Sequence, residues 1–100
     1  MFQITAAELQ QKLLNKEEIV LIDVRESSEH EAFNIGGALI PLSEIMNAAE
    51  AIPRDKPVIL YCKMGIRSQI AIQRLSDKYG YSNLINLKGG VEAWKKLFNG

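Results

Sequence analysis

The sequence predicts an α/β protein with a mostly parallel five-stranded sheet and helices on both faces. Strand-like apolar segments alternate with helical segments along the chain, which is the pattern of a parallel sheet joined by helical crossovers. The run from Val58 to Cys62, which follows Pro57, is apolar without interruption and suits a strand covered on both faces. The chain has 100 residues, enough for one modest core, so we expect a single domain over residues 1–100.

The first third of the chain predicts two strands and a helix. Residues 2–4 can form a short strand. Thr5 and Glu8 have the spacing of a capping box and predict a helix that ends near Asn15. Residues 19–22 are apolar and predict a second buried strand.

The middle of the chain predicts shorter elements. Residues 27–33 can form a short helix with a serine cap, and the glycine pair at 36–37 predicts a turn. Residues 38–40 then predict a third strand. Ser43 can cap another helix, whose apolar stripe would consist of Leu42, Ile45, Met46 and Ala49.

The last third predicts two helices around one strand. A helix begins near Ser68, and Gly80 is placed to end it. Residues 83–87 predict the fifth strand, and a final helix opens after the glycines at 89–90. Trp94 is expected to be a packing anchor on this helix, because it shares the helical spacing of its apolar neighbours.

Composition and charge exclude several classes of protein. Twelve basic and twelve acidic residues give a net charge of zero, so bulk charge predicts neither a nucleic-acid nor a membrane partner. A single cysteine excludes an internal disulfide and a cysteine-cluster metal site, and we expect no metal. No signal peptide or membrane-spanning segment is expected. A lone reactive thiol favours a reducing compartment, which predicts a cytoplasmic protein.

The strongest functional candidate is Cys62, at the end of the buried strand and before a helix. Open α/β sheets place their ligand sites at this edge. Unpaired N–H groups of a tight loop and of a first helical turn carry partial positive charge, so they favour the thiolate, the nucleophilic form. Gly65 permits unusual loop geometry, while Lys63 and Arg67 could hold an anion. The alternative is that Cys62 is simply a small buried apolar residue.

Polar residues elsewhere have simpler interpretations. Asp23 and Arg25 follow the second strand, where they either face the ligand or form a structural ion pair, and we favour the ion pair. His30, the only histidine, lies among acidic residues and is expected to be a solvated helix residue, with catalysis the less favoured alternative.

The loop Cys62-Lys63-Met64-Gly65-Ile66-Arg67-Ser68 resembles the active-site loop of the rhodanese family of sulfurtransferases. Four residues separate the cysteine from the arginine, one fewer than in cysteine phosphatases. Other segments resemble the same family over nearly the whole chain, namely residues 21–26, 37–42, 75–81 and 87–94. The chain departs from the family where Asn34 and Gly36 stand in place of a histidine and a proline, which is expected to loosen that turn.

The resemblance implies a three-layer rhodanese-like fold and ping-pong transfer of sulfane sulfur. Cys62 would be the nucleophile that carries a persulfide, and the N–H groups of residues 64–68 would cradle the terminal sulfur. Lys63 and Arg67 would bind an anionic donor such as thiosulfate, although Arg67 could instead brace the loop. Ser68 would either donate its hydroxyl to the sulfur or cap the helix.

No cofactor is implied, and the sulfur acceptor would be cyanide or a thiol. Two alternatives to this enzyme remain. The protein could be a non-catalytic module or a sulfur-relay partner that receives persulfide from another protein. It could also be a phosphatase, which the short loop disfavours.

Overall fold

The computed structural model describes residues 1–99 and contains a parallel sheet whose strands run in the order β1-β5-β4-β2-β3. Each pair of neighbours is parallel, so the predicted five-stranded, mostly parallel sheet is confirmed. The strands are β1 (Phe2–Ile4), β2 (Val20–Asp23), β3 (Ala38–Leu39), β4 (Val58–Tyr61) and β5 (Leu84–Leu87).

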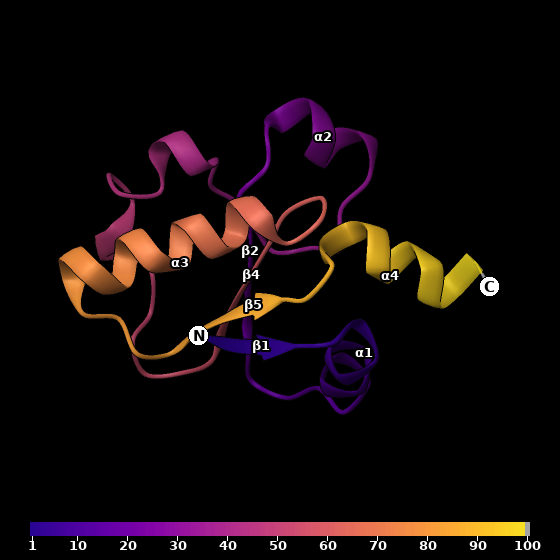
Figure 1. Ribbon diagram of the computed structural model, residues 1–100. Coiled ribbons are helices and arrows are strands. Elements are labelled where there is room, and N and C mark those ends of the chain that lie inside the picture. The colour runs from indigo at the N-terminus through magenta and orange to yellow at the C-terminus, as the bar shows by residue number, and fades with distance from the viewer. Residues whose placement is uncertain (100) are drawn as a thin grey trace.

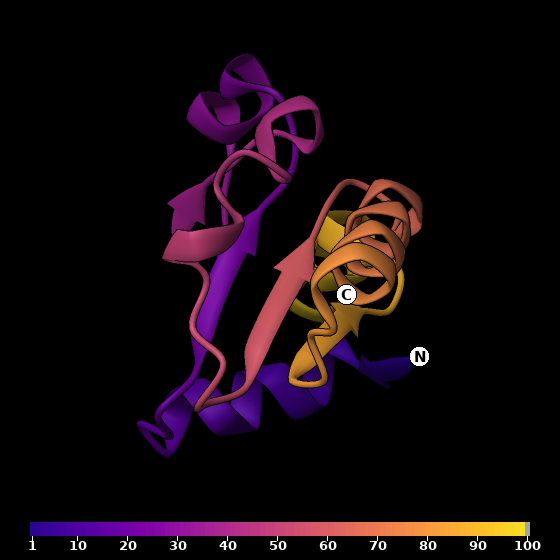
Figure 2. The same cartoon turned by 90° about the vertical axis from the view of Figure 1, so that its left-hand side faces the viewer.

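Helices cover both faces of this sheet (Figures 1 and 2). The helix α1 (Ala6–Leu14) packs with α4 (Gly90–Asn99) on one face, and α3 (Ile66–Tyr79) covers the other. The short helix α2 (Ser27–Ala32) lies beyond the sheet, at the end toward which the arrows of β2 and β4 point in Figure 2. This end carries the carboxyl termini of the parallel strands, where ligand sites of such sheets form.

The central strand β4 supplies both halves of the core. Its side chains alternate between faces, as they must in a strand. Val58, Leu60 and Cys62 pack in the cluster beneath α3, whereas Ile59 and Tyr61 pack in the cluster beneath α1 and α4. All of them are buried, which confirms that the apolar run marks a strand covered on both sides.

The local sequence patterns correctly predicted the start of α1 and the end of α3. Thr5 Oγ1 accepts a hydrogen bond from the N–H of Glu8 at 3.1 Å, and Glu8 returns one to the N–H of Thr5 at 2.9 Å, so the capping box is present. Gly80 ends α3 in the left-handed region at φ 70°. Trp94 packs against the core beneath α4, as expected of an anchor.

Two details of the predicted helices are wrong. The expected helix after Ser43 is replaced by two 3-10 segments, η1 (Leu42–Glu44) and η2 (Ala49–Ala51). The buried hydroxyl of Tyr81 shares its one proton between the carbonyls of Ala49 and Ile52, which holds this segment in a shape a regular helix would not have. At α2 the helix begins at Ser27, so the capping residue is Glu26 rather than a serine, and the N–H of Glu26 donates to the carboxylate of Glu29.

No helix within residues 1–99 is long and apolar enough to cross a membrane.

The turn at residues 34–36, where the sequence departs from the rhodanese pattern, is held by its neighbours. The Tyr61 hydroxyl donates to the carbonyl of Gly36 at 2.8 Å and accepts from the N–H of Ile35 at 3.1 Å. Asn34 donates to the carbonyl of His30 at 2.9 Å. Burial raises the pKa of Tyr61, so the hydroxyl stays protonated and keeps donating. These bonds supply contacts for a turn that the sequence alone suggested would be loose.

Replacing Tyr61 by phenylalanine is expected to lower the free energy of unfolding by about 1–3 kcal/mol, because two backbone groups lose their partner. Chemical denaturation measures this loss. Tyr79→Phe is the matched control, because the Tyr79 side chain is exposed, and the free energy of unfolding of this variant should change little. Equal losses in the two variants would show that the Tyr61 hydroxyl does not hold the turn.

Candidate active site

The candidate site is a short loop around the sulfur of Cys62, directly after β4. Cys62 is only 1% exposed. Its Sγ accepts hydrogen bonds from the N–H of Gly65 at 3.1 Å and from the N–H of Ser68 at 3.4 Å. The Ser68 Oγ also lies 3.4 Å from Sγ. Two of the N–H groups that the sequence places around the cysteine therefore point at its sulfur.

Gly65 gives the loop its shape. It precedes the first residue of α3 with φ at 90°, in the region that favours glycine. A Cβ there would lie 3.2 Å from both the nitrogen of Gly89 and the carbonyl oxygen of Leu87. The loop therefore turns back on itself and packs closely against the segment between β5 and α4.

The first turn of α4 holds the other side of the loop. The N–H of Val91 donates to the carbonyl of Cys62 at 2.9 Å, and the N–H of Glu92 donates to the carbonyl of Lys63 at 3.0 Å. Gly90 makes this approach possible, because a Cβ on it would lie 2.4 Å from the Cys62 carbonyl oxygen. Helix α4 thus uses N–H groups that are free in its first turn to fix the backbone of the cysteine loop.

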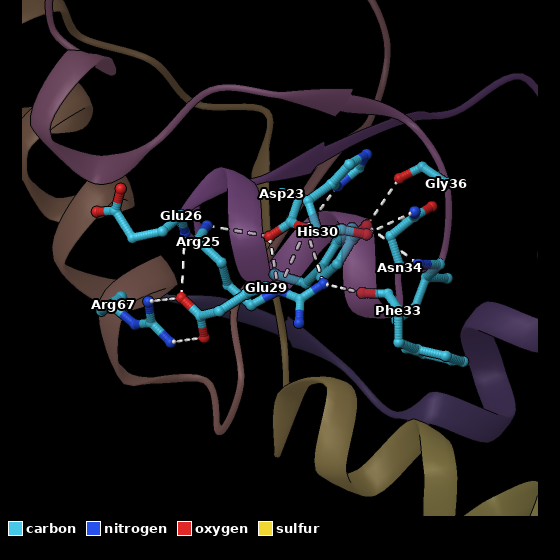
Figure 3. A network of polar contacts seen from close by, with 11 residues as sticks. Asp23, Arg25, Glu26, Glu29, His30, Phe33, Asn34, Gly36 and Arg67 are labelled. Carbon is cyan, nitrogen blue, oxygen red and sulfur yellow. Dashed lines mark hydrogen bonds and ion pairs between the residues drawn. The ribbon is translucent and has the colours of Figure 1, made fainter.

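Arg67 joins the loop to α2 (Figure 3). Its Nη1 and Nη2 contact the two carboxylate oxygens of Glu29 at 2.7 and 2.9 Å, a bidentate ion pair. The hydrogen bonds from Arg67 lower the pKa of Glu29 to about 2, so the pair is charged at neutral pH. This geometry matches the alternative in which Arg67 braces the loop instead of binding a donor.

Asp23 gathers donors beneath α2 (Figure 3). Its carboxylate forms a buried ion pair with Arg25, with Nη2 to Oδ2 at 2.9 Å, and also accepts from the Arg25 N–H at 3.0 Å. Although burial opposes its charge, the bonds to Asp23 raise the pKa of Arg25. These residues therefore pair with each other, as a structural role requires.

His30 is not the solvated residue that the sequence suggested. Its Nδ1 lies 2.8 Å from Oδ2 of Asp23, and the ring is half-buried. The acidic neighbours of His30 in the sequence suggested an exposed position. In the structure α2 lies across the end of the sheet, and one side of the helix faces the strands. His30 extends the polar network around Asp23. This network lies beside the ion pair of Glu29 and Arg67, which connects α2 to the cysteine loop.

The rim of the loop combines charge with apolar surface. Met64 and Ile66 are 61% and 65% exposed. On the side of α2 and α4, a cavity of about 210 Å³ is lined in part by Lys63, Lys95 and Arg25. Arg25 is 4% exposed, and its Nη1 has no hydrogen-bond partner within residues 1–99. In the same part of the chain no three His, Cys, Asp or Glu residues are grouped to hold a metal ion.

Two residues at the site were not identified from the sequence. Glu29 pairs with a residue 38 positions away, and nothing in its local pattern indicates that contact. Asn86 is fully buried and accepts from the hydroxyl of Ser68 at 2.5 Å. Its signal was available, because an amide inside the otherwise apolar strand Leu84–Leu87 needs a buried partner.

The sequence matches the Rhodanese-like domain family over residues 5–97. The chain belongs to the rhodanese-like family. The thiosulfate sulfurtransferase GlpE of Coxiella burnetii is 35% identical over 85 residues, covering 84% of this chain and 78% of that protein. The family resemblance read from the cysteine loop is thereby confirmed.

Similarity extends to a larger protein and to a solved structure. The probable adenylyltransferase/sulfurtransferase MoeZ of Mycobacterium tuberculosis is 36% identical over 93% of this chain, which spans only 24% of MoeZ. The human single-domain sulfurtransferase TSTD1 superposes with a TM-score of 0.81 at 28% identity and covers 96% of each chain. This rhodanese-like fold is therefore found both alone and as part of a longer chain.

Gly90→Ala is expected to destabilise this rhodanese-like domain more than Gly80→Ala, by about 1–3 kcal/mol. Both glycines have positive φ, but a Cβ at position 80 meets nothing within 4 Å, whereas one at position 90 overlaps the carbonyl of Cys62. Chemical denaturation of the two variants compares backbone strain alone, in Gly80→Ala, with backbone strain plus steric overlap, in Gly90→Ala. The rate of Cys62 alkylation should change only in Gly90→Ala, and equal effects on stability would contradict the close approach.

The Glu29 carboxyl is expected to titrate near pH 2 in the folded protein, against an ordinary value of 4.5. Because folding lowers this pKa, the ion pair stabilises the fold fully above pH 4.5, and that stabilisation is lost as pH falls toward 2. An NMR titration of the Glu29 side-chain carbon measures it. Arg67→Met should return the pKa toward 4.5.

Lys63→Met is the matched control for that titration. It removes a positive charge from the same loop and leaves the Arg67–Glu29 pair intact, so Glu29 should still titrate near pH 2. A similar rise in both variants would mean that general positive charge, rather than the bidentate pair, holds the Glu29 carboxylate.

Proposed function

We propose that this protein is a sulfurtransferase that moves sulfane sulfur from an anionic donor, such as thiosulfate, to cyanide or a thiol through a persulfide on Cys62. The observation that carries the proposal is the pair of N–H groups, of Gly65 and Ser68, that donate to the cysteine sulfur. Fixed dipoles of this kind stabilise negative charge on sulfur without having to reorient during the reaction. A cysteine that was only a core residue would not need them.

The proposed reaction has two steps. The Cys62 thiolate attacks the outer sulfur of thiosulfate, a new S–S bond forms, and sulfite leaves with the electron pair of the broken S–S bond. An acceptor nucleophile then attacks the terminal sulfur of the persulfide, and the bonding pair returns to Cys62 as thiolate. The near-complete burial of Cys62 suits this chemistry, because only a slim terminal atom of a donor can reach the sulfur.

An anionic donor fits the charges beside the loop. Lys63, Lys95 and the buried Arg25 line the neighbouring cavity together with Glu92 and with Glu29, whose charge is paired with Arg67. Nη1 of Arg25 is available to an oxyanion. Arg67 is already paired with Glu29, so in this proposal it braces the loop. The name of the Coxiella burnetii relative, thiosulfate sulfurtransferase, supports thiosulfate as the first donor to test.

One observation favours a second candidate, a sulfur relay between proteins. Met64 and Ile66 are large apolar side chains that remain mostly exposed on either side of Gly65. Apolar side chains at the mouth of a site suit contact with a partner protein better than contact with a small anion. In this alternative Cys62 accepts persulfide sulfur from a protein and passes it on.

The deciding measurement is thiocyanate production from thiosulfate and cyanide. The native protein should turn over many times, and Cys62→Ser should fall to the rate of the uncatalysed mixture while its thermal unfolding stays cooperative. Mass spectrometry of protein treated with thiosulfate should show one added sulfur atom, which cyanide removes. A persulfide without turnover would favour the relay. Absence of both from folded protein would contradict sulfur transfer at Cys62.

A further inference from the structure

A chain of hydrogen bonds leads from the cysteine sulfur to the edge of the sheet. Ser68 on α3 lies 3.4 Å from Sγ and donates its hydroxyl proton to Oδ1 of Asn86 on β5. The Nδ2 of Asn86 donates in turn to Oε1 of Gln3 on β1, at 3.1 Å. Ser68 and Asn86 are fully buried, whereas Gln3 is exposed. The chain therefore connects the sulfur to a residue at the surface.

The direction of the hydrogen bonds in this chain determines whether Ser68 presents an acceptor or a donor to the sulfur. A hydroxyl has a single proton, and that of Ser68 is committed to Asn86. The Ser68 oxygen therefore presents a lone pair to Cys62, which suits a protonated thiol that donates to it. A thiolate or a persulfide anion requires the opposite arrangement, with a donor facing the sulfur.

Both amides in the chain can supply that opposite arrangement. If the side-chain amides of Asn86 and Gln3 each turn by half a rotation, oxygen and nitrogen exchange places. Gln3 then donates to Asn86, Asn86 donates to the Ser68 oxygen, and Ser68 donates to the sulfur. Each buried nitrogen and oxygen of the chain keeps at least one partner in both arrangements, so neither leaves a polar atom without a hydrogen bond. A carboxylate in place of either amide accepts only and allows the first arrangement alone.

We propose that Gln3, Asn86 and Ser68 form a reversible hydrogen-bond chain that presents an acceptor to the Cys62 thiol and a donor to its anionic forms. Asn86 and Gln3 are positioning residues, since they act on the sulfur only through the Ser68 hydroxyl. The value of this device to catalysis depends on the sulfurtransferase function proposed above. Its effect on ionisation of the thiol does not.

The test fixes the direction of the chain from its exposed end. Gln3→Glu has nearly the shape of the native residue but accepts only, so it holds the Ser68 proton away from the sulfur. Gln3→Lys donates only, so it turns that proton toward the sulfur. The measured quantity is the pH midpoint of thiolate formation, followed by ultraviolet absorbance. The signal belongs to one residue, because the chain has one cysteine, and Cys62→Ser supplies the tyrosine background.

The midpoint is expected to rise in Gln3→Glu and to fall in Gln3→Lys, each by about half a pH unit to one pH unit, the effect of one hydrogen bond gained or lost by the charged form. The other charges near the sulfur, on Lys63, Arg67, Glu29 and the Asp23–Arg25 pair, are the same in both variants. Their contributions cancel in the comparison.

The introduced charges themselves would shift the midpoint in the same directions, so two controls separate the effects. In a Ser68→Ala background the charges remain but the chain is broken, and both shifts should largely disappear. In the native background about 1 M salt screens the charge of an exposed residue, yet the shifts should persist. Shifts that keep their full size in the Ser68→Ala background, or that vanish in salt, would overturn the chain. None of these readings requires sulfur transfer, so they stand apart from the thiocyanate assay.

Discussion

The N–H groups of Gly65 and Ser68 must converge on one sulfur atom, and most of the surrounding structure maintains that geometry. Gly65 supplies the turn that no other residue would adopt easily. The first turn of α4 fixes the loop carbonyls on one side, and the Arg67–Glu29 pair ties the start of α3 to α2 on the other. The strand β4 ends at Tyr61, so the next side chain, that of Cys62, enters this enclosure. A loop of this size has few bonds of its own and depends on all three neighbours.

Most of the fold followed from local patterns in the sequence. Alternating apolar segments, the Thr5 capping box and Gly80 located the sheet and the long helices, because each of these signals acts within one turn or one strand. The segment after Ser43 was predicted as a helix because its stripe has helical spacing. That prediction failed because Tyr81, which is distant in sequence, holds the carbonyls of Ala49 and Ile52. A local pattern cannot report a contact of that kind.

The site was predictable in its centre and not in its surroundings. The position of Cys62 after a buried strand and before a helix was sufficient to indicate a loop of N–H groups. The partners of that loop come from elsewhere in the chain: Glu29 from α2, and Asn86 from β5. His30 was misjudged for the same reason, since its contact with Asp23 depends on how α2 lies over the sheet. Sequence spacing identifies the nucleophile, whereas tertiary packing determines which residues support it.

The strand order also governs when the cysteine loop can be completed during synthesis. Within the sheet β1 pairs only with β5, so the first of these five strands to be synthesised has no partner until the fifth is made. Asn86, Gly90 and the first turn of α4 belong to that same late segment. A nascent chain that has reached α3 already contains Cys62. It still lacks the segment between β5 and α4 that packs against Gly65, and the N–H groups of α4 that bind the loop carbonyls. The supports that β5 and α4 give to the thiol loop are therefore added last, when β5 docks between β4 and β1.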